Sequence, residues 1–534
     1  MPLRGRGGIA AFRRRPVWPR GIAMGDNRGR EEARARLEAR RARSEGPREG
    51  APRRPATARP AGSERSVRSG GGSTRRPSAP PVRVQTQQYA VSSRGYSRSA
   101  GKRALVLVAA ALAVLLVVFL LVKGCSFDEP DSAGEGAGTA SSQGQVATKP
   151  SSSIPAGSVE TIDENGIVHG TTPDGVSYTV VGRGVESETA GKVTLLAAGD
   201  QLATDNLLAI TDAYAGEVGD GEYDFRPLYR EVEPLVKAAD IAFINQETVM
   251  AGEEEYDYSG WPSFNTPEAA AAAISEVGFD LVNFATNHTY DYYTYGVEQS
   301  FGVWEKYPNL VVGGSYPTQA DRETVHMIER DGMTFAFLAY CYGDNYLGTY
   351  ENFPNQHYMC GFDKQAMEAD IKRAQSVADA VIVAMHWGTE YVVEPNDQQM
   401  EYAKFLADLD VDLVLGTHAH IMQPVKYVTG DTGNTIPVVF GLSDFVSGWT
   451  TTNYILSGLF TCEFARGEAG VEVSGLTWYP TIEWSNGEDV YVRLLKDMDE
   501  ATTNANTRTE DVDDDYTYLR DFVNASGMEI PVVM

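Results

Sequence analysis

The sequence predicts a layered α/β domain carried by a single membrane-spanning segment, and three observations lead to this fold class. Short apolar runs alternate with amphipathic stretches between residues 191 and 496. One uninterrupted apolar run occupies residues 104–122. The charge is also divided: residues 1–103 hold 26 Lys and Arg against 7 Asp and Glu, whereas the rest of the 534-residue chain holds 20 against 66. A chain of this length and charge division has more than one structural part.

Residues 1–103 are rich in Arg, Pro, Gly and Ser and have almost no apolar periodicity. Such a segment cannot bury enough apolar surface to fold. Within it, Glu31 to Arg43 could form a helix against anionic lipid headgroups. Nucleic-acid binding is the alternative for so basic a segment, but no aromatic residues are interleaved with the arginines of that run. We therefore expect a disordered, basic cytoplasmic segment and no nucleic-acid partner.

The run "ALVLVAAALAVLLVVFLLV" at 104–122 carries no charge, and as a helix it would span roughly 28 Å, the thickness of one bilayer core. Lys102, Arg103 and the arginines before them favour a cytoplasmic N-terminus by the positive-inside rule. Because so long a segment precedes the run, it is unlike a cleaved signal peptide. The prediction is an uncleaved anchor in the cell membrane, with the acidic C-terminal domain extracytoplasmic.

Residues 123–190 are predicted to form an extracytoplasmic stalk, because the segment begins with a flexible stretch rich in Ser, Gly and Ala. Near its end, "GIVHG" and "VSYTVVG" flank the turn signal Pro173-Asp-Gly, which indicates a small hairpin. The folded domain is expected at 191–496. An acidic C-terminal tail or peripheral helix follows at 497–534.

The chain has four cysteines, which suits an extracytoplasmic domain that does not depend on a disulfide framework. Cys341 and Cys360 lie on either side of a polar loop and could pair, with two free thiols as the alternative. Cys462 follows Leu459-Phe-Thr in an apolar run and is expected in the core. Cys125 stands two residues after Lys123 and makes a poor lipid-attachment site.

Inside the domain, amphipathic stretches predict four helices, at Pro227–Ala239, Pro267–Val277, Lys364–Ala378 and Gln398–Leu409. The continuous apolar runs between them are typical of strands buried on both faces. Strands alternating with helices indicate a sheet covered by helices, with ligands bound near the carboxyl ends of the strands.

Five of these apolar runs end in side chains that can bind a metal ion. They are Asp200, Asn245 with Glu247, Asn287 with His288, His386, and His418 with His420. A packing role is the alternative for any one of them. A sheet, however, gathers its strand ends at one edge, so the set predicts a shared site. Imidazole, carboxylate and amide together suit Zn²⁺, Mn²⁺ or Fe²⁺. The candidates exceed what one tetrahedral ion needs, which leaves room for two ions with Glu247 bridging them.

The motifs "AAGD", "INQE", "ATNHTYD", "HWGTEY" and "GTHAHIMQP" resemble, in this order, those of the capsule-synthesis CapA family of poly-gamma-glutamate capsule proteins. That family is similar in fold to the calcineurin-like metallophosphoesterases. The resemblance covers about residues 192–447. It implies a metallophosphoesterase-like layered domain.

Carried over by position, the resemblance implies a set of metal-site residues, namely Asp200, Glu247, Asn287, His386 and His418, with His420 as a further ligand. It implies that His288 assists the leaving group as an acid or electrostatic partner. Four more residues are expected to contact substrate or to support the ligands: Asn245, Asn265 in "SFNTP", Glu390 and Tyr391.

Four positions depart from the expected patterns. General metallophosphoesterases have a histidine two residues after the first aspartate, where this chain has Leu202, a gap that the capsule family shares. Ser443-Asp444-Phe445 stands where Gly-Asn usually precedes the phenylalanine, and Tyr293 stands where glycine is common. These departures leave open whether one of two metals is bound weakly or is absent, and which substrate is used.

The expected function is metal-dependent hydrolysis or transfer of a bond in an anionic surface polymer during capsule biosynthesis or attachment. A non-catalytic export or assembly factor, which binds the polymer beside its synthase subunits, is the alternative from another class of protein. A surface phosphoesterase is the third. The sequence does not choose among an amide, an ester and a phosphoester bond.

Overall fold

The computed structural model of the protein describes residues 154–449, 455–468, 470–507 and 530–533. The predicted basic segment 1–103 and the predicted membrane span 104–122 lie outside these residues. Across the described ranges, no helix is both long enough and apolar enough to cross a bilayer.

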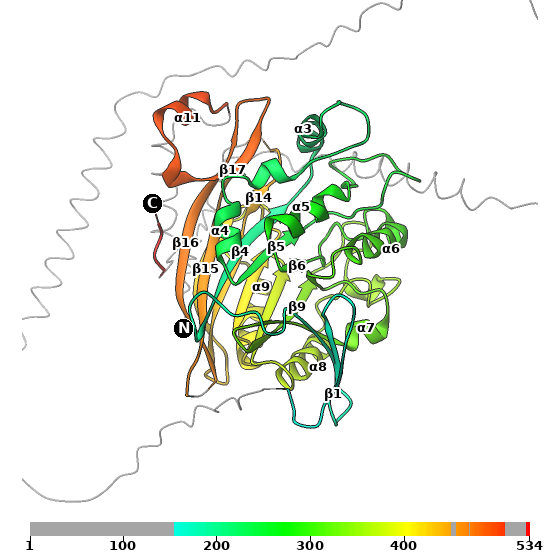
Figure 1. Cartoon of the computed structure of the whole chain (residues 1–534), viewed down its shortest axis with the longest axis vertical. Helices are drawn as coiled ribbons and strands as arrows, with labels where there is room; N and C mark the ends of the chain where they lie inside the picture. The colour runs from blue at the N-terminus through cyan, green and yellow to red at the C-terminus, as the bar shows by residue number, and fades with distance from the viewer. Residues whose placement is uncertain (1–153, 450–454, 469, 508–529, 534) are drawn as a thin grey trace, which may run out of the picture. The chain divides into compact units, whose positions relative to one another are not determined.

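Two β-sheets form the centre of the domain (Figure 1). The nine-stranded sheet has the order β1-β2-β3-β8-β9-β10-β11-β13-β12. Its strands are β1 Val159–Ile162, β2 Val168–Thr171, β3 Ser177–Val181, β8 Val325–Arg330, β9 Met333–Cys341, β10 Ala380–His386, β11 Leu413–Thr417, β12 Met422–Thr429 and β13 Thr435–Leu442. The strands β9, β10 and β11 run parallel.

The eight-stranded sheet has the order β17-β16-β15-β4-β5-β6-β7, and β14 also pairs with β4. Its strands are β4 Lys192–Gln201, β5 Ile241–Gln246, β6 Leu281–Asn283, β7 Val311–Gly313, β14 Asp444–Val446, β15 Leu456–Arg466, β16 Val471–Ser485 and β17 Val490–Leu494. The strands β4 to β7 run parallel, so their carboxyl ends lie at one edge.

The two sheets pack face to face around an apolar core. Phe243 of β5 meets Phe337 of β9 edge to face, with ring centroids 5.9 Å apart. The same cluster contains Leu195 of β4 and Ile382 of β10, all fully buried. This core holds the carboxyl edges of β4–β6 against those of β10 and β11.

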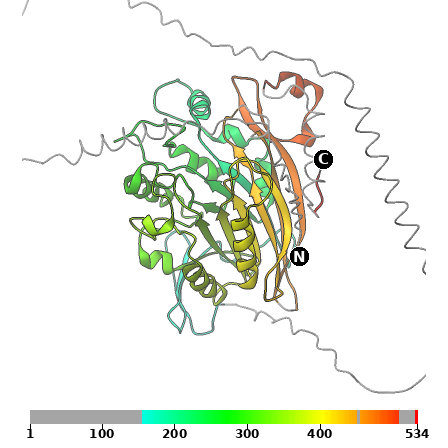
Figure 2. The same ribbon diagram turned by 180° about the vertical axis from the view of Figure 1, so that it is seen from behind.

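Helices cover both outer faces. Residues of α3 (Asp205–Ala215), α4 (Glu233–Ala238), α5 (Ala269–Val277) and α6 (Tyr293–Trp304) pack on the eight-stranded sheet. Those of α8 (Lys364–Gln375) and α9 (Asp397–Asp408) pack on the nine-stranded sheet. In Figure 1, α4 and α5 lie in front of β4 and β5; in Figure 2, the yellow α9 lies in front of the opposite sheet. The layers are helix, sheet, sheet, helix.

This arrangement confirms the predicted layered α/β class, and α5, α8 and α9 fall within or beside the predicted helical stretches. The stretch predicted at 227–239 is a 3-10 turn, Arg226–Tyr229, followed by the short α4. The expectation of one sheet edge is corrected, because the five strand ends with candidate metal ligands come from two facing sheets.

Both ends of the described domain extend its sheets. The predicted hairpin is present as β2 and β3, and β3 pairs in parallel with β8, so the sheet starts before the expected boundary at residue 191. At the other end, the backbone N–H of Val533 donates to the carbonyl of Trp478 at 2.9 Å. Residues 530–533 therefore pair with β16, whereas the sequence predicted only an acidic tail or a peripheral helix there.

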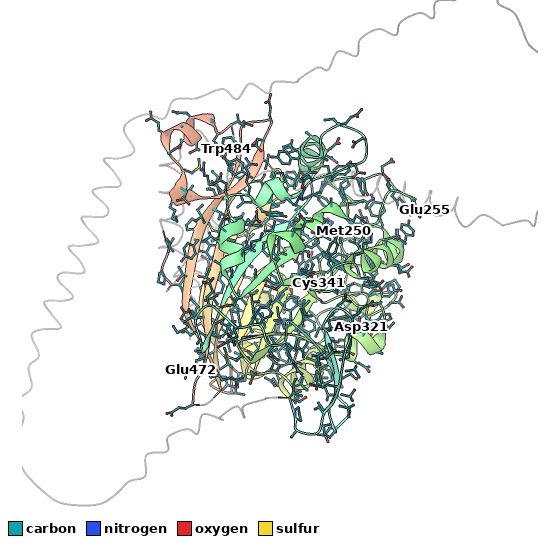
Figure 3. All side chains as sticks on the ribbon, viewed as in Figure 1. Met250, Glu255, Asp321, Cys341, Glu472 and Trp484 are labelled. Atoms are coloured by element: carbon teal, nitrogen blue, oxygen red, sulfur yellow. The ribbon has the colours of Figure 1, made fainter. Side chains whose placement is uncertain are left out.

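Cys341 and Cys360 are buried free thiols, so the disulfide considered for them is absent. Their backbones are joined instead, since the N–H of Cys341 donates to the carbonyl of Cys360 at 2.9 Å. Figure 3 shows Cys341 in the middle of the domain, where it is fully buried. Cys462 is buried in the core between the sheets, as predicted.

Candidate metal centre

A ladder of polar side chains joins the carboxyl ends of β4, β5 and β6. The Asn245 amide donates to Oδ1 of Asp200 at 2.7 Å, and the Asn283 amide donates to Oδ1 of Asn245 at 2.6 Å. The strand register places Asp200 beside Asn245 and Asn245 beside Asn283. Asn245 thus holds the carboxylate of Asp200 in place from the neighbouring strand. This contact orients the second carboxylate oxygen of Asp200 toward the histidines.

Glu247 follows β5 directly and is fully buried. Neither of its carboxylate oxygens accepts a hydrogen bond from any residue within the described ranges. Its Oε1 lies 3.7 Å from Nε2 of His420 and 3.9 Å from Nε2 of His386. Burial raises the pKa of Glu247 well above its ordinary value, against the opposing charge of His420. A buried carboxylate without a hydrogen bond is costly unless a cation accompanies it.

His386 ends β10 and is fully buried. Its Nδ1 lies 2.9 Å from Oγ1 of Thr417 on the neighbouring strand, and its Nε2 lies 2.8 Å from Oδ1 of Asn287. Burial holds the pKa of His386 well below its ordinary value, so the ring is neutral near pH 7. Neutral imidazole is the form that binds metal ions.

His418 and His420 lie in the loop after β11, and both have left-handed backbone, with φ of 89° and 58°. This conformation is uncommon for residues with a Cβ and marks backbone held by its surroundings. The backbone N–H of His418 donates to Oδ2 of Asp200 at 3.4 Å, and the two imidazole rings lie 5.9 Å apart. The turn thus brings two imidazoles from one short segment to the carboxylates of the facing sheet.

His420 is surrounded by carboxylates. Its Nδ1 lies 2.8 Å from Oδ1 of Asp444 and 3.5 Å from Oδ2 of Asp200. Burial disfavours a charge on His420, but the nearby carboxylates, Glu247 first and then Asp444, outweigh burial and raise its pKa well above the ordinary value.

Three overlapping groups of side chains in the described residues have ligand atoms within 4.8 Å of one another. They are Glu247 with His386 and His418, Glu390 with His418 and His420, and Asp200 with His420 and Asp444. The donors mix imidazole nitrogen and carboxylate oxygen, which suits a borderline divalent ion. The buried oxygens of Glu247 and their lack of hydrogen bonds fit such an ion as well.

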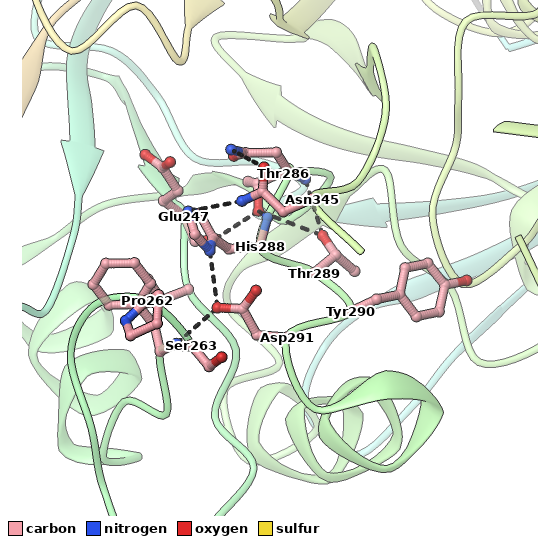
Figure 4. Close-up of polar contacts among 12 residues, drawn as sticks. Glu247, Pro262, Ser263, Thr286, His288, Thr289, Tyr290, Asp291 and Asn345 are labelled. Atoms are coloured by element: carbon pink, nitrogen blue, oxygen red, sulfur yellow. Dashed lines mark hydrogen bonds and ion pairs between the residues drawn. The ribbon is translucent and has the colours of Figure 1, made fainter. Parts of the chain in front are cut away.

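His288 lies in the loop after β6, beside this cluster (Figure 4). Its Nδ1 lies 2.8 Å from Oδ2 of Asp291, and its Nε2 lies 3.3 Å from the amide nitrogen of Asn345. The ring of Phe264 packs edge to face on the imidazole, with centroids 4.7 Å apart. These three contacts fix the orientation of His288.

Two of the residues expected near substrate lie at the cluster. Glu390 belongs to one of the three ligand groups, and the ring of Tyr391 lies 5.7 Å from that of His420. The Tyr391 residue is 44% exposed, so it reaches the surface.

The expected role of Asn265 is not supported. Its Oδ1 accepts the N–H of Ala251 at 2.8 Å, and its amide donates to the carbonyl of Gly252 at 2.8 Å. The side chain is fully buried. Asn265 therefore braces the loop after β5 instead of contacting substrate, because its polar atoms are occupied by backbone groups.

The sequence reasoning missed Asp444, Asp291 and Asn345 as site residues. Asp291 was visible three residues after His288, the spacing at which a carboxylate can reach a preceding imidazole. Asp444 was visible only as a departure from a family pattern. Asn345 follows a strand that ends in no ligand, and no signal in the sequence marked it.

This fold and site define a class of protein: a layered α/β domain with a buried, polar site that can hold a divalent metal ion. Residues 194–449 match the family model described as "Bacterial capsule synthesis protein PGA_cap". Over these residues the chain matches the capsule-synthesis CapA family.

Two curated relatives agree. The chain is 26% identical over 229 residues to the "PGA biosynthesis protein CapA" of Bacillus subtilis, which is 42% of this chain and 58% of that protein. It is 24% identical over 271 residues to the "Capsule biosynthesis protein CapA" of Bacillus anthracis, covering 49% and 62%. The chain thus spans about six tenths of the length of these relatives.

Among solved structures, the sulfate thiohydrolase SoxB of Thermus thermophilus in complex with glycerol aligns with a TM-score of 0.32. The sequence identity is 15%, and the alignment covers 63% of this chain and 61% of that one. A similarity of this size carries no argument about fold or activity.

Proposed function

We propose that the domain is a metal-dependent hydrolase or transferase of the metallophosphoesterase type, acting in the biosynthesis or attachment of a surface polymer of the poly-gamma-glutamate class. The observation that carries this proposal is Glu247, a fully buried carboxylate with no hydrogen bond from the described residues, close to His386 and His420. Its relatives in Bacillus, by their names, belong to capsule biosynthesis.

The ligand set for one divalent ion (Mn²⁺, Zn²⁺ or Fe²⁺) comprises Glu247, His386, His418 and Asn287, with Asp200 and His420 beside them. When bound, such an ion supplies a water of lowered pKa and a positive charge for the attacked group. Thr417 contacts Nδ1 of His386, while Asn245 donates to Asp200, so both residues hold the ligands in place. Ligand support of this kind sets metal affinity.

His288 is suited to handle the proton of the leaving group. The Asp291 carboxylate is fully buried and contacts Nδ1 of His288, which favours the tautomer with the ring proton on Nδ1. Nε2 then accepts from the Asn345 amide, 3.3 Å away, and is the ring nitrogen left to take up and release a proton. A structural metal site has no use for an oriented imidazole beside its ligands, so this dyad favours the enzyme over a non-catalytic export or assembly factor.

The loops at the carboxyl edges carry no lysine or arginine. They are residues 202–204, 247–268, 284–292, 314–318, 342–363, 387–396 and 418–421, together with 443–449. Several acids stand there instead, among them Glu253, Glu254 and Glu255. An anionic polymer at this edge therefore meets no lysine or arginine in these loops, which supports metal-dependent binding as well as metal-dependent turnover.

The test uses the protein from residue 126 onward, purified, stripped with chelator and reloaded with Mn²⁺. Cleavage or transfer of poly-gamma-glutamate and hydrolysis of an aryl phosphate ester are measured on the same samples. Metal-dependent action on the polymer supports the proposal, and action on the aryl ester alone favours the surface phosphoesterase. Metal-dependent polymer binding without turnover favours the assembly factor, and the absence of bound metal in every sample contradicts all three metal-based functions.

We further propose that residues 104–122 anchor the protein in the cell membrane, with the acidic domain outside and the basic segment inside. The support is the charge division and the uninterrupted apolar run. Protease added to intact cells should remove the domain and spare residues 1–103. Protection of the domain in intact cells would contradict this topology.

A further inference from the structure

We propose that Asp444 is a metal ligand, and that with Asp200 and His420 it forms a second metal position beside the one made by Glu247, His386 and His418. This inference rests on the proposed metal-dependent function. It concerns a residue at which this chain departs from the Gly-Asn pattern noted for its family.

The backbone places Asp444 beside Asp200. Strand β14 pairs in parallel with β4, and the pair is in register at Asp444 and Asp200. The N–H of Asp200 donates to the carbonyl of Ser443 at 2.9 Å. A Cβ at position 199 would lie 1.8 Å from that carbonyl oxygen, so only glycine allows the two strands this close. Gly199 in "AAGD" thereby brings two aspartates to one point.

The side chain of Asp444 is directed at the cluster. It is 1% exposed, its Oδ1 contacts Nδ1 of His420 at 2.8 Å, and its Oδ2 accepts no hydrogen bond from any described residue. Its ligand atom lies within 4.8 Å of those of Asp200 and His420. A buried carboxylate oxygen directed at an imidazole and a second carboxylate is the arrangement that a cation completes.

The charges make the same point. Asp200, Glu247 and Asp444 place three buried carboxylates around His420, and the surrounding loops contain no lysine or arginine. Glu247 is the carboxylate that would join the two positions, because its Oε1 lies 3.7 Å from Nε2 of His420 and 3.9 Å from Nε2 of His386. Metal pairs that share a carboxylate stand about 3.5–4 Å apart.

The proposed second metal position also explains how the site can lack a histidine ligand at position 202, where this chain has leucine. The metallophosphoesterase pattern has a histidine ligand two residues after the first aspartate, and this chain has a buried leucine there. The N–H of Leu202 donates to the carbonyl of Val446 at 3.0 Å, so the same strand that contacts Leu202 supplies Asp444. A carboxylate from β14 thus provides the third protein ligand that Leu202 cannot.

The experiment compares full-length Asp444→Asn with the unaltered full-length protein, each stripped of metal and titrated with Mn²⁺ by calorimetry and elemental analysis. We expect two ions per chain in the unaltered protein. We expect one in Asp444→Asn, with affinity for the second ion weakened at least about 100-fold. The matched control is Asp363→Asn, since Asp363 caps α8 and asparagine caps equally well. It should keep both ions.

The outcomes separate this inference from the proposed function. Two ions bound with unchanged affinity in Asp444→Asn would overturn the inference and leave the proposed function intact. Loss of both ions in this variant would have the same consequence, because it would mean that the chain has one shared metal site. No bound ion in the unaltered protein would overturn both. Electron paramagnetic resonance of the unaltered protein loaded with Mn²⁺ tests the inference without a variant. We expect the signal of two magnetically coupled Mn²⁺ ions. The signal of isolated ions at saturating Mn²⁺ would overturn the second metal position.

Discussion

The Nδ1 atom of His288 lies 2.8 Å from Oδ2 of Asp291, and the same oxygen accepts a 2.7 Å hydrogen bond from the N–H of Phe264. The carboxylate therefore ties the imidazole to the loop after β5 (Figure 4). Because His288 itself belongs to the loop after β6, the dyad links two strand ends of the eight-stranded sheet. This geometry separates the residue proposed to handle protons from the residues proposed to hold metal.

Variants of two histidines should therefore differ. His418→Ala should lose bound metal without unfolding, since an edge site contributes less to stability than the sheets. His288→Ala should keep the metal and lose turnover by about 10²- to 10⁴-fold, the scale of general acid catalysis. Elemental analysis beside the polymer assay measures both. Equal metal content in the two variants and the unaltered protein, with unchanged activity, would show that these histidines serve packing.

Glu247→Gln should stabilise the metal-free protein. The neutral amide has nearly the same shape and avoids burying a charge, so we expect the free energy of unfolding to rise by about 1–3 kcal/mol. The same variant should lose the stabilisation that Mn²⁺ gives the unaltered protein. Thermal unfolding with chelator and with Mn²⁺ measures both changes. A variant that is less stable without metal and equally stabilised by Mn²⁺ would argue against Glu247 as a ligand.

Asp344→Asn should change how stability depends on pH. Burial raises the pKa of Asp344 to about 7, although the N–H groups of Leu347 and Tyr346 oppose the shift. The ordinary value of an unfolded aspartate is about 3.9. The folded state thus holds this proton more tightly, so its contribution to stability is full below about pH 4 and is lost as the pH rises through about 7.

Asparagine does not titrate, so the stability of the variant relative to the unaltered protein should rise between pH 4 and 8, by about 1–4 kcal/mol from the linkage. Urea unfolding at several pH values measures this difference. The Asp363→Asn variant, changed at a partly exposed helix cap, is the control. A difference that stays flat with pH would mean that the folded state does not perturb Asp344.

Cys341 and Cys360 should resist alkylation in the folded protein. Both thiols are buried, and burial raises the pKa of Cys360 to about 11 and that of Cys341 well above its usual range. The thiolate is the reactive form, so iodoacetamide should label neither until the protein is unfolded, and then should label both without a reductant. Recovery of a linked peptide from unreduced protein would contradict the free thiols.

The sequence by itself determined the layered class and most of the site. Apolar runs that end in Asp200, Glu247, His386 and the His418 loop predict a shared edge, because a strand buried on both faces has nowhere else to place polar groups. The structure brings these residues together, but from the ends of strands in two facing sheets. The α5, α8 and α9 helices were equally readable, because their amphipathic periodicity is local.

Only the tertiary structure decided that two facing sheets share the site, and that Asp444 belongs to it while Asn265 braces a loop. These facts depend on pairing between distant segments: β14 reaches β4 because Gly199 leaves room for the carbonyl of Ser443, and Asn265 is occupied by the backbone of Ala251 and Gly252. Local sequence patterns show which residues are polar. They do not show which backbone group each polar side chain will contact, because those contacts form only when the sheets pack.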